Sequence, residues 1–380
     1  MPNYYFIVPV WGAEYIDTFL RLSLPTQLSP GNLGGLGHRN DIAYRIYTRP
    51  QDVETICSST VFANLSSLMD TDVVPASEIT FDGVHHYEPF SACYKLGMKE
   101  ASRDGAASIF LNADHIWADG ALTHILKLGD EGKRVVMLAG PRVLRETFVP
   151  AFLGRRSQVE GSAITLSSRE AVQWTLDHLH PWDRSLFWDP DNLGRPASFM
   201  FWRVGQEGFI MRCFHLHPIL VHPYTDYPDF PNTIDGSDFV KRVCPRRREV
   251  HVVEDSDEVM YFSIAPAEQS AELINRPRVD WRGVVTMVKA CGLGSHNLYY
   301  LQRTIRFHVG EISDEWLAVE RLSDVLVDQV RRAIDNPWKL AYYRLRLWVL
   351  SKIGAFLQTN PSFHRILKRT LGMIRTNKSI

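Results

Sequence analysis

The sequence has few cysteines, no long apolar run and almost no net charge. Its 380 residues contain five cysteines, and no two of them have the Cys-x-x-Cys spacing of a zinc ribbon or a redox pair. An odd, scattered set also does not suit a disulfide framework, so we expect a reducing compartment. No stretch of 18 apolar residues is present, and the first residues lack the basic and apolar regions of a signal peptide. We therefore expect a cytoplasmic protein without a transmembrane helix.

Charge is balanced overall but unevenly distributed along the chain. The 42 basic and 43 acidic residues give a net charge of −1, which disfavours a nucleic-acid-binding protein. Nine of the basic residues and none of the acidic ones lie in residues 337–380, which leaves 33 basic against 43 acidic residues elsewhere. Within this tail, residues 361–375 place apolar and basic side chains on opposite sides of a helical wheel, as in helices that lie on membranes.

The basic tail therefore predicts peripheral attachment to an anionic membrane surface, here the cytoplasmic face. The alternative is that the tail docks on the acidic body of its own chain or of a sister subunit. The sequence predicts no particular oligomeric state.

Short apolar segments alternate with segments of helical periodicity along the first half of the chain. Four apolar segments are predicted to be strands, at residues 4–10, 42–47, 108–111 and 135–139. Five segments are predicted to be helical, at residues 14–28, 51–70, 90–101, 121–128 and 167–178. This alternation predicts an α/β fold with a mostly parallel sheet flanked by helices. Three further strands and a long amphipathic helix are expected at residues 197–204, 209–216, 250–253 and 315–336.

A polar cluster follows directly after the predicted strand at residues 108–111. Asn112 and Asp114 stand two residues apart there, and open α/β sheets bind ligands at the carboxyl ends of their strands. Oxygen ligands of this kind suit Mg²⁺ or Mn²⁺, and such an ion would hold a diphosphate as a leaving group. The simpler alternative is that Asp114 or Asp119 caps the following helix.

The same segment resembles the Asp-x-Asp region of glycosyltransferases with the GT-A fold. In that family an apolar strand runs into Asp-Ala-Asp, and here residues 111–114 read Leu-Asn-Ala-Asp. Residues 6–12 resemble the first βα unit of that fold, which holds the nucleoside of a nucleotide-sugar donor. The resemblance implies a GT-A-like (Rossmann-like) domain at residues 1–265, followed by a helical extension at residues 266–380.

What the resemblance implies about activity is the transfer of a sugar from a nucleotide-sugar donor to a hydroxyl of a glycan or glycolipid. The implied donor contacts are Val8, Pro9 and Trp11 for the nucleoside, with Asn112 and Asp114 for the diphosphate or its metal ion. Because Asn112 replaces the first acidic residue of the motif, a divalent cation (Mn²⁺ or Mg²⁺) is expected to bind weakly, and a metal-independent enzyme is an open alternative.

Basic residues would serve a metal-independent enzyme instead. Arg142 follows the strand predicted at residues 135–139 and is the preferred charge partner of a diphosphate, ahead of Arg145. The alternative for both arginines is a surface ion pair.

Two later clusters supply further candidates. His215 and His217 are predicted to lie on one face of a strand, and His217 is a candidate third metal ligand. The alternative is a pair of hydrogen-bonded histidines at a sheet edge. Asp235 and Asp238 are candidates for the base of an inverting transfer, with Asp255 as a third, although Asp235 followed by glycine also suits a simple turn. A retaining transfer would need no such base.

Two other functions remain open. One is a non-catalytic peripheral membrane protein built on a degenerate transferase domain, which Asn112 supports. The other is a phosphoryl-transfer enzyme of the haloacid dehalogenase type, but its chemistry requires an aspartate nucleophile where Asn112 stands.

Overall fold

The computed structural model describes most of residues 3–336, together with Trp338, Leu345 and Val349. The segments within residues 3–336 that are not described are 38–39, 82–86, 156–160, 190–193, 195–197, 228–233, 236–238, 271–277 and 291–294. Most of the predicted membrane-binding tail and one candidate base, Asp238, therefore lie outside the described residues.

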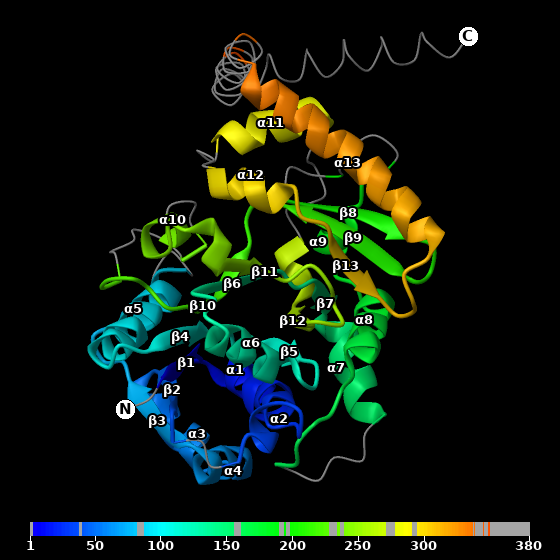
Figure 1. The fold of residues 1–380 in the computed structure, drawn as a ribbon. Helices are drawn as coiled ribbons and strands as arrows, with labels where there is room; N and C mark the ends of the chain where they lie inside the picture. The colour runs from blue at the N-terminus through cyan, green and yellow to red at the C-terminus, as the bar shows by residue number, and fades with distance from the viewer. Residues whose placement is uncertain are drawn as a thin grey trace, which may run out of the picture.

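A seven-stranded sheet forms the centre of the fold, in the order β11-β6-β10-β4-β1-β2-β3 (Figure 1). Its strands are β1 (Tyr4–Pro9), β2 (Ile42–Thr48), β3 (Asp70–Pro75), β4 (Ala107–Phe110), β6 (Val135–Leu138), β10 (His217–Val221) and β11 (Val250–Val252). β10 is antiparallel to both of its neighbours, β4 and β6, and the other neighbouring strands are parallel. The prediction of an α/β fold with a mostly parallel sheet is confirmed.

Both faces of this sheet are covered by helices, because alternate residues of β1 point into two hydrophobic cores. Tyr4, Phe6 and Val8 belong to the first core, and Tyr5 and Ile7 belong to the second. The helices that contribute to the first core are α1 (Ala13–Thr18), α2 (Leu24–Gln27), α3 (Val53–Cys57), α4 (Thr60–Leu68) and α6 (Ala121–Asp130). A π-helical turn, η1 (Phe19–Ser23), joins α1 to α2, and α5 (Tyr87–Arg103) covers the second face.

A second, three-stranded sheet carries the segments that follow β4 and β6. It contains β5 (His115–Trp117), β12 (Tyr261–Ala265) and β7 (Arg142–Leu144), in that order. Helices α7 (Arg145–Gly154) and α8 (Ser168–Asp177) pack against it. At the start of α8, Ser167 and Glu170 exchange the two hydrogen bonds of a capping box, as their spacing predicts.

A third sheet joins the late part of the chain to the middle. It contains β13 (Ile305–His308), β9 (Gly208–Cys213) and β8 (Phe199–Val204), and α11 (Trp281–Ala290) and α13 (Asp314–Asp335) cover it (Figure 1). The region predicted as a helical extension contains α11, α12 (Ser295–Leu301) and α13, and it also contributes the strand β13. Because β13 pairs with β9, this sheet spans the predicted boundary at residue 265. The division into two domains stays a prediction.

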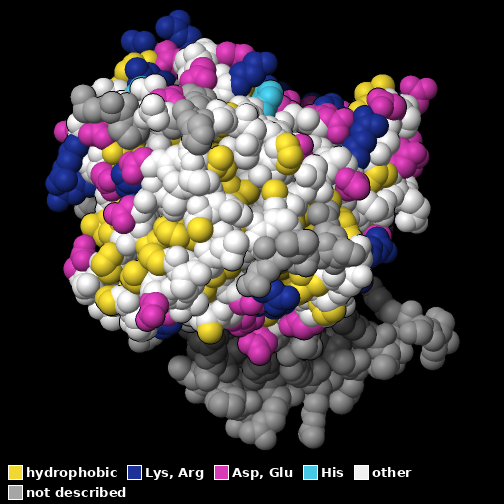
Figure 2. All heavy atoms as spheres, turned by 90° about the horizontal axis from the view of Figure 1, so that it is seen from below, with side chains coloured by type: hydrophobic (Ala, Val, Ile, Leu, Met, Phe, Trp, Pro, Cys, Tyr) yellow, Lys and Arg dark blue, Asp and Glu magenta, His cyan; other side chains and the backbone are white. Residues whose placement is uncertain are grey.

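The remaining short helices are α9 (Pro181–Arg184), α10 (Phe239–Val243) and α12 (Ser295–Leu301). Among the helices of the described part of the chain, none combines the length and the apolar composition needed to cross a membrane. Seen from below, basic and acidic side chains are interspersed over the surface (Figure 2).

Candidate functional site

The predicted site residues meet at one edge of the central sheet. β1 and β4 are parallel neighbours, and β4 and β6 share the antiparallel neighbour β10, so all three strands end at the same edge. Asn112 and Asp114 follow β4 and therefore lie at this edge. β10 runs the opposite way, and its first residue, His217, is therefore paired with Leu138, the last residue of β6. The antiparallel strand thus brings a residue from late in the chain to the carboxyl ends of the parallel strands.

Asn112 uses its side-chain amide on neighbouring residues. The Tyr94 hydroxyl donates to Asn112 Oδ1 at 2.6 Å, and Asn112 Nδ2 lies 3.1 Å from His115 Nε2. Burial, together with the charge of His217, holds the pKa of His115 well below 6.5, so its ring is neutral and Nε2 accepts from Asn112. Both polar atoms of Asn112 therefore have partners in the protein.

Asp114 is a partly buried carboxylate with an unusual pKa. Burial raises its pKa to about 6, even though the positive charges of Arg142 and Arg145 act in the opposite direction. The Ile264 N–H donates to the Asp114 backbone carbonyl at 3.0 Å and fixes the loop. In addition to burial, the charge of Asp114 raises the pKa of three nearby tyrosines, Tyr15, Tyr94 and Tyr261.

Tyr261 forms an aromatic stack beside Asp114. Its ring centroid lies 4.9 Å from that of Trp117 and 4.6 Å from that of His115. A Cβ atom at Gly140 would lie 2.5 Å from the Tyr261 ring, so glycine is required where the chain leaves β6. The stack packs both ends of β5 against the first residue of β12, close to the end of β6.

Two arginines approach Asp114 from β7 and the first turn of α7. The guanidinium carbon of Arg142 lies 5.5 Å from the centre of the Trp182 ring. Arg145 forms an ion pair with Glu14, and its guanidinium carbon lies 5.8 Å from the centre of the Tyr15 ring. Arg145 Nε is buried without a hydrogen-bond partner among the described residues. An N–H donor beside Asp114 is therefore unused by the protein.

His217 forms a close pair with Asp235. Its Nδ1 lies 2.8 Å from Asp235 Oδ1, and its Nε2 lies 3.4 Å from the carbonyl oxygen of Phe110. Burial lowers the pKa of His217, but these two oxygen acceptors outweigh it and raise the pKa above 6.5. Both ring nitrogens therefore face oxygen atoms of the protein. The Asp235 side chain is still 46% exposed and can reach a bound ligand.

The prediction that His215 and His217 lie on one face of a strand is wrong. β9 ends at Cys213 and β10 begins at His217, because the chain passes from the third sheet to the central sheet between them. The His215 N–H donates to Cys213 Sγ at 3.2 Å in this connection. The alternation rule applies only within an uninterrupted strand.

The three residues predicted to contact a nucleoside differ in exposure. Val8 and Pro9 are buried in β1, and Val8 as a whole is 0% exposed, so neither residue is open to a ligand in this structure. Trp11 is partly exposed, and its ring centroid lies 5.0 Å from that of Phe81 and 4.6 Å from that of Phe90. These three rings form an aromatic cluster just beyond the end of β1.

The residues at this edge do not fit a divalent cation. Asn112 Oδ1 already accepts from Tyr94, and the two ring nitrogens of His217 are directed at Asp235 and at the Phe110 carbonyl oxygen. Of the three predicted metal ligands, Asp114 remains, and it lies beside two arginines. This arrangement favours an anionic ligand balanced by guanidinium groups. Elsewhere in the described part of the chain, one group of side chains could hold a metal ion, namely Asp255, Asp257 and His308.

Comparisons with known proteins give only distant similarity. No family model and no curated protein matches the sequence. A structure of S. aureus TarS residues 1–349 is 13% identical, with a TM-score of 0.35, and covers 83% of this chain and 71% of that chain. A second structure of S. aureus TarS is 12% identical, with a TM-score of 0.34, and covers 79% of this chain and 42% of that chain. TM-scores of this size do not establish a common fold, so the function is argued from the site itself.

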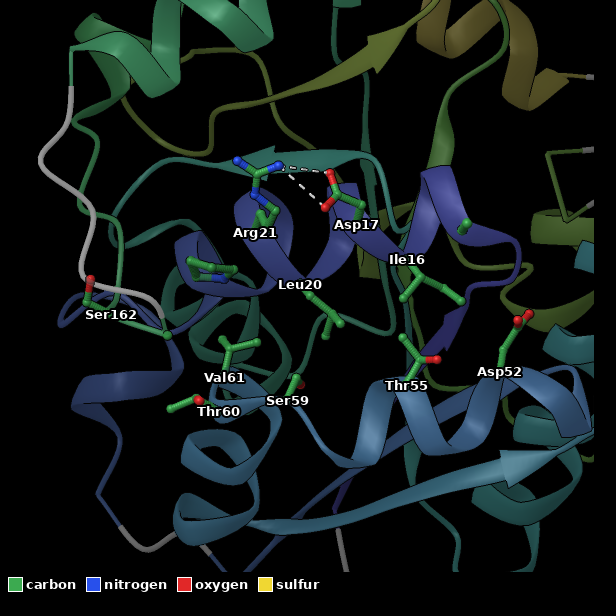
Figure 3. Close-up of a pocket in the computed structure, with 13 residues that line it drawn as sticks. Ile16, Asp17, Leu20, Arg21, Asp52, Thr55, Ser59, Thr60, Val61 and Ser162 are labelled. Atoms are coloured by element: carbon green, nitrogen blue, oxygen red, sulfur yellow. Dashed lines mark hydrogen bonds and ion pairs between the residues drawn. The ribbon is translucent and has the colours of Figure 1, made fainter.

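A groove of about 620 Å³ opens between α1–η1 and α3–α4 (Figure 3). In Figure 3 the side chains of Ile16 and Leu20 face those of Thr55 and Val61 across it. The residues that line it include none of the predicted site residues. The groove therefore lies beside, and not within, the site at the sheet edge.

One residue of the groove reaches the end of β1. The Gly12 N–H donates to the Asp52 carboxylate at 3.1 Å, and Asp52 also pairs with Arg49 at 2.7 Å. Gly12 has a φ of 82°, in the region that favours glycine, so the chain can turn sharply here between β1 and α1. This network sets the position of the backbone that follows Trp11.

Proposed function

We propose that the protein is a glycosyltransferase that moves a sugar from a nucleotide-sugar donor to a hydroxyl of a glycan or glycolipid. The observation that carries this proposal is the placement of Arg142 and Arg145 around Asp114, close to the His217–Asp235 pair. In addition to burial, the charges of Asp114 and Asp235 both raise the pKa of Tyr94 and of Tyr261, which supports treating the two carboxylates as parts of one site. Cationic donors for a leaving diphosphate and a held carboxylate for a base are the groups that an inverting sugar transfer needs.

Each residue would have a defined part in the reaction. Trp11 would stack on the nucleobase, and the buried Val8 and Pro9 would hold the end of β1 in place behind it. Arg142 and Arg145 would bind the diphosphate and stabilise the negative charge that develops on it as the bond to the sugar breaks.

The acceptor side of the reaction would depend on the other two groups. Asp114 would accept hydrogen bonds from sugar hydroxyls of the donor. In an inverting transfer, Asp235 would take the proton from the acceptor hydroxyl as its oxygen attacks the anomeric carbon, while His217 holds the carboxylate in place. Asp238 remains the other candidate base, and a retaining transfer would use neither.

Binding of a nucleotide-sugar should depend on the arginines and not on a metal ion. With the donor that binds best from a panel of UDP, GDP, CMP and dTDP sugars, we expect turnover to persist in EDTA. Arg142→Gln and Arg145→Gln should each weaken donor binding by about 10- to 100-fold, because each removes a charge-assisted hydrogen bond of roughly 1.5–3 kcal/mol. Isothermal titration and steady-state kinetics measure both effects.

Arg21→Gln is the matched control, because Arg21 is an exposed arginine paired with Asp17 on the groove side of α1–η1. It should leave donor binding unchanged. Loss of turnover in EDTA that Mn²⁺ restores would return Asn112 and Asp114 to the role of metal ligands. Failure of every nucleotide in the panel to bind the folded protein would remove the proposed function.

We also propose that the basic tail holds the enzyme on the cytoplasmic face of an anionic membrane, where a lipid-linked acceptor would be found. Trp338, Leu345 and Val349 support this, because they are apolar and yet their exposed fractions are 85%, 60% and 39%. Exposed apolar side chains in a basic segment suit the headgroup region of a membrane.

Liposome flotation should separate the two forms of the protein. The full chain should float with vesicles that contain anionic lipid at low salt and less at high salt, since each Lys or Arg near the surface contributes about 1 kcal/mol that salt screens. A chain lacking residues 337–380 should stay unbound. Equal flotation of both forms would show that the tail is not the attachment, and would favour docking on the body of the protein.

A further inference from the structure

A second group of metal-ligating side chains lies where the loop after β11 meets the end of β13. Asp255 and Asp257 belong to this loop, and His308 is the last residue of β13. One ligand atom from each of the three lies within 4.8 Å of the others. The His308 side chain is 4% exposed, whereas both carboxylates remain partly open to solvent. None of the three belongs to the sugar-transfer site described above.

Backbone hydrogen bonds fix the two ligand-bearing segments relative to each other. The Ser256 N–H donates to the Arg306 carbonyl at 2.9 Å, and the His308 N–H donates to Ser256 Oγ at 3.2 Å. Within the loop, the Asp257 N–H donates to Asp255 Oδ1 at 2.8 Å. These hydrogen bonds bring the three side chains together in the folded protein, so a metal ion would bind to a site that is already formed.

The orientation of His308 leaves one ring nitrogen directed at the carboxylates. Its Nδ1 lies 2.6 Å from the Gly310 carbonyl oxygen, which only accepts, so Nδ1 carries a hydrogen. Its Nε2 lies 2.8 Å from Asp255 Oδ1 and 3.9 Å from Asp257 Oδ2. Two acceptor oxygens facing this nitrogen require a cation between them, either a proton on Nε2 or a metal ion. A histidine held through Nδ1 by a backbone carbonyl is typical of metal sites.

The ion pairs around the group leave an excess of negative charge. Arg169 pairs with Asp257 at 2.9 Å and with Glu311 at 2.8 Å, while Asp255 has His308 as its ion-pair partner among the described residues. Two further pairs border the group, Arg303–Glu254 and Arg306–Glu320. With His308 neutral, these five carboxylates face three arginines, and the difference of two charges matches a divalent cation.

We propose that Asp255, Asp257 and His308 bind a divalent transition-metal ion, Zn²⁺ or Mn²⁺, which links the central sheet to the third sheet. One imidazole nitrogen with two carboxylate oxygens suits such ions better than Mg²⁺ or Ca²⁺, which favour oxygen ligands alone. The ion takes the place of the proton on His308 Nε2, and water completes its shell on the exposed side of the carboxylates. Its role is structural, because it joins the loop after β11 to β13.

Thermal unfolding and titration calorimetry of the full-length protein, stripped with EDTA and dialysed, test this proposal. Zn²⁺ or Mn²⁺ should bind with one ion per chain and raise Tm by about 5 °C at 100 times its Kd, since a ligand that binds the folded state alone stabilises it. Mg²⁺ and Ca²⁺ should give smaller shifts. His308→Gln and Asp257→Asn should each abolish the metal-dependent rise.

Glu258→Gln is the matched control, because Glu258 contacts His124 at 3.2 Å and His251 at 2.5 Å in a neighbouring group of the same residue types. It should keep the metal-dependent rise. If His308→Gln does not fold, the partly exposed Asp257→Asn variant decides the matter alone, with circular dichroism as the check on folding. Absence of binding below 1 mM, or an equal rise in Asp257→Asn, would overturn the proposal. EDTA should lower Tm without stopping donor turnover, which separates this site from the sugar-transfer site.

Discussion

Replacing Asp235 with Asn should lower the kcat of an inverting sugar transfer by about 10²- to 10⁴-fold, the usual contribution of a general base. The substitution keeps the size of the side chain. The amide oxygen of the asparagine can still accept a hydrogen bond from His217 Nδ1 in place of the carboxylate. Because it removes the group that accepts the proton, the KM for the donor should change little. Steady-state kinetics with saturating donor and a range of acceptor concentrations measure the effect.

His217→Gln should have a smaller effect than Asp235→Asn, since His217 acts by holding the carboxylate and not by touching the substrate. Asp226→Asn is the matched control, because Asp226 is an exposed aspartate that accepts a hydrogen bond from Ser102. It should behave as the unmodified enzyme does. An unchanged kcat in Asp235→Asn would exclude this residue as the base and would leave Asp238 or a retaining transfer.

Replacing Asp114 with Asn should make the folded protein more stable at neutral pH while sugar transfer is lost. In the folded protein the pKa of Asp114 is about 6, against 3.8 in an unfolded chain. Folding therefore disfavours the charged form of Asp114. The wild type has its full free energy of unfolding below pH 4, and part of it is lost as the pH rises from 4 to 6. At about 1.4 kcal/mol per pKa unit, the loss is about 3 kcal/mol at most. Asparagine carries no charge at any pH and avoids it.

Urea denaturation at pH 4, 5, 6 and 7.5 measures this difference. The free energy of unfolding should be nearly equal for the two proteins at pH 4, and Asp114→Asn should gain the advantage between pH 4 and 6, with a plateau above. If the free energies of unfolding of the two proteins differed by the same amount at every pH, the pKa of Asp114 would be the same in the folded and the unfolded chain. An Asp114→Asn variant that keeps full sugar transfer would exclude Asp114 from the donor site.

Local patterns in the sequence predicted most of the central sheet. The apolar run at residues 4–10 and the periodic stretch at residues 315–336 correspond to β1 and α13. The Ser167–Glu170 spacing predicted a helix start that the structure confirms in both hydrogen bonds. These features depend on neighbours within a few residues, so their signal is contained in the sequence near them.

Features that depend on distant pairing were missed. β10 is five residues long and was merged with β9, because nothing local indicates that the chain changes sheets after Cys213. β13 is four residues long and pairs with a strand about 95 residues earlier, so no pattern within its own segment predicts it.

In the candidate site, too, the sequence predicted local features and missed those that depend on distant contacts. The position of Asp114 at a strand end followed from the run into the polar cluster, but its pKa depends on burial that no local pattern predicts. The Tyr94 hydroxyl, which donates a hydrogen bond to Asn112 Oδ1, comes from α5. The apolar periodicity of that helix predicts Tyr94 as a core residue and gives no sign that its hydroxyl has a polar partner. The buried and unpartnered Nε of Arg145 likewise appears only when α7 is placed beside α1. The roles of these residues in catalysis stay predictions.

The position of β10 has a consequence for how the chain acquires its structure during synthesis. β4 and β6 are complete once residue 138 has been made, but the strand that joins them is about 80 residues further along. Before β10 is made, the nascent chain can form the partial sheet β4-β1-β2-β3, but β6 has no strand partner in the central sheet, because its other neighbour, β11, comes after β10. The edge of β4 and both edges of β6 then have unpaired N–H and C=O groups, which are prone to pair with other chains. Because His217 begins β10, the insertion that closes the sheet also completes the proposed catalytic pair. A nascent or truncated chain that ends before this strand thus lacks both the closed sheet and the proposed base with its partner.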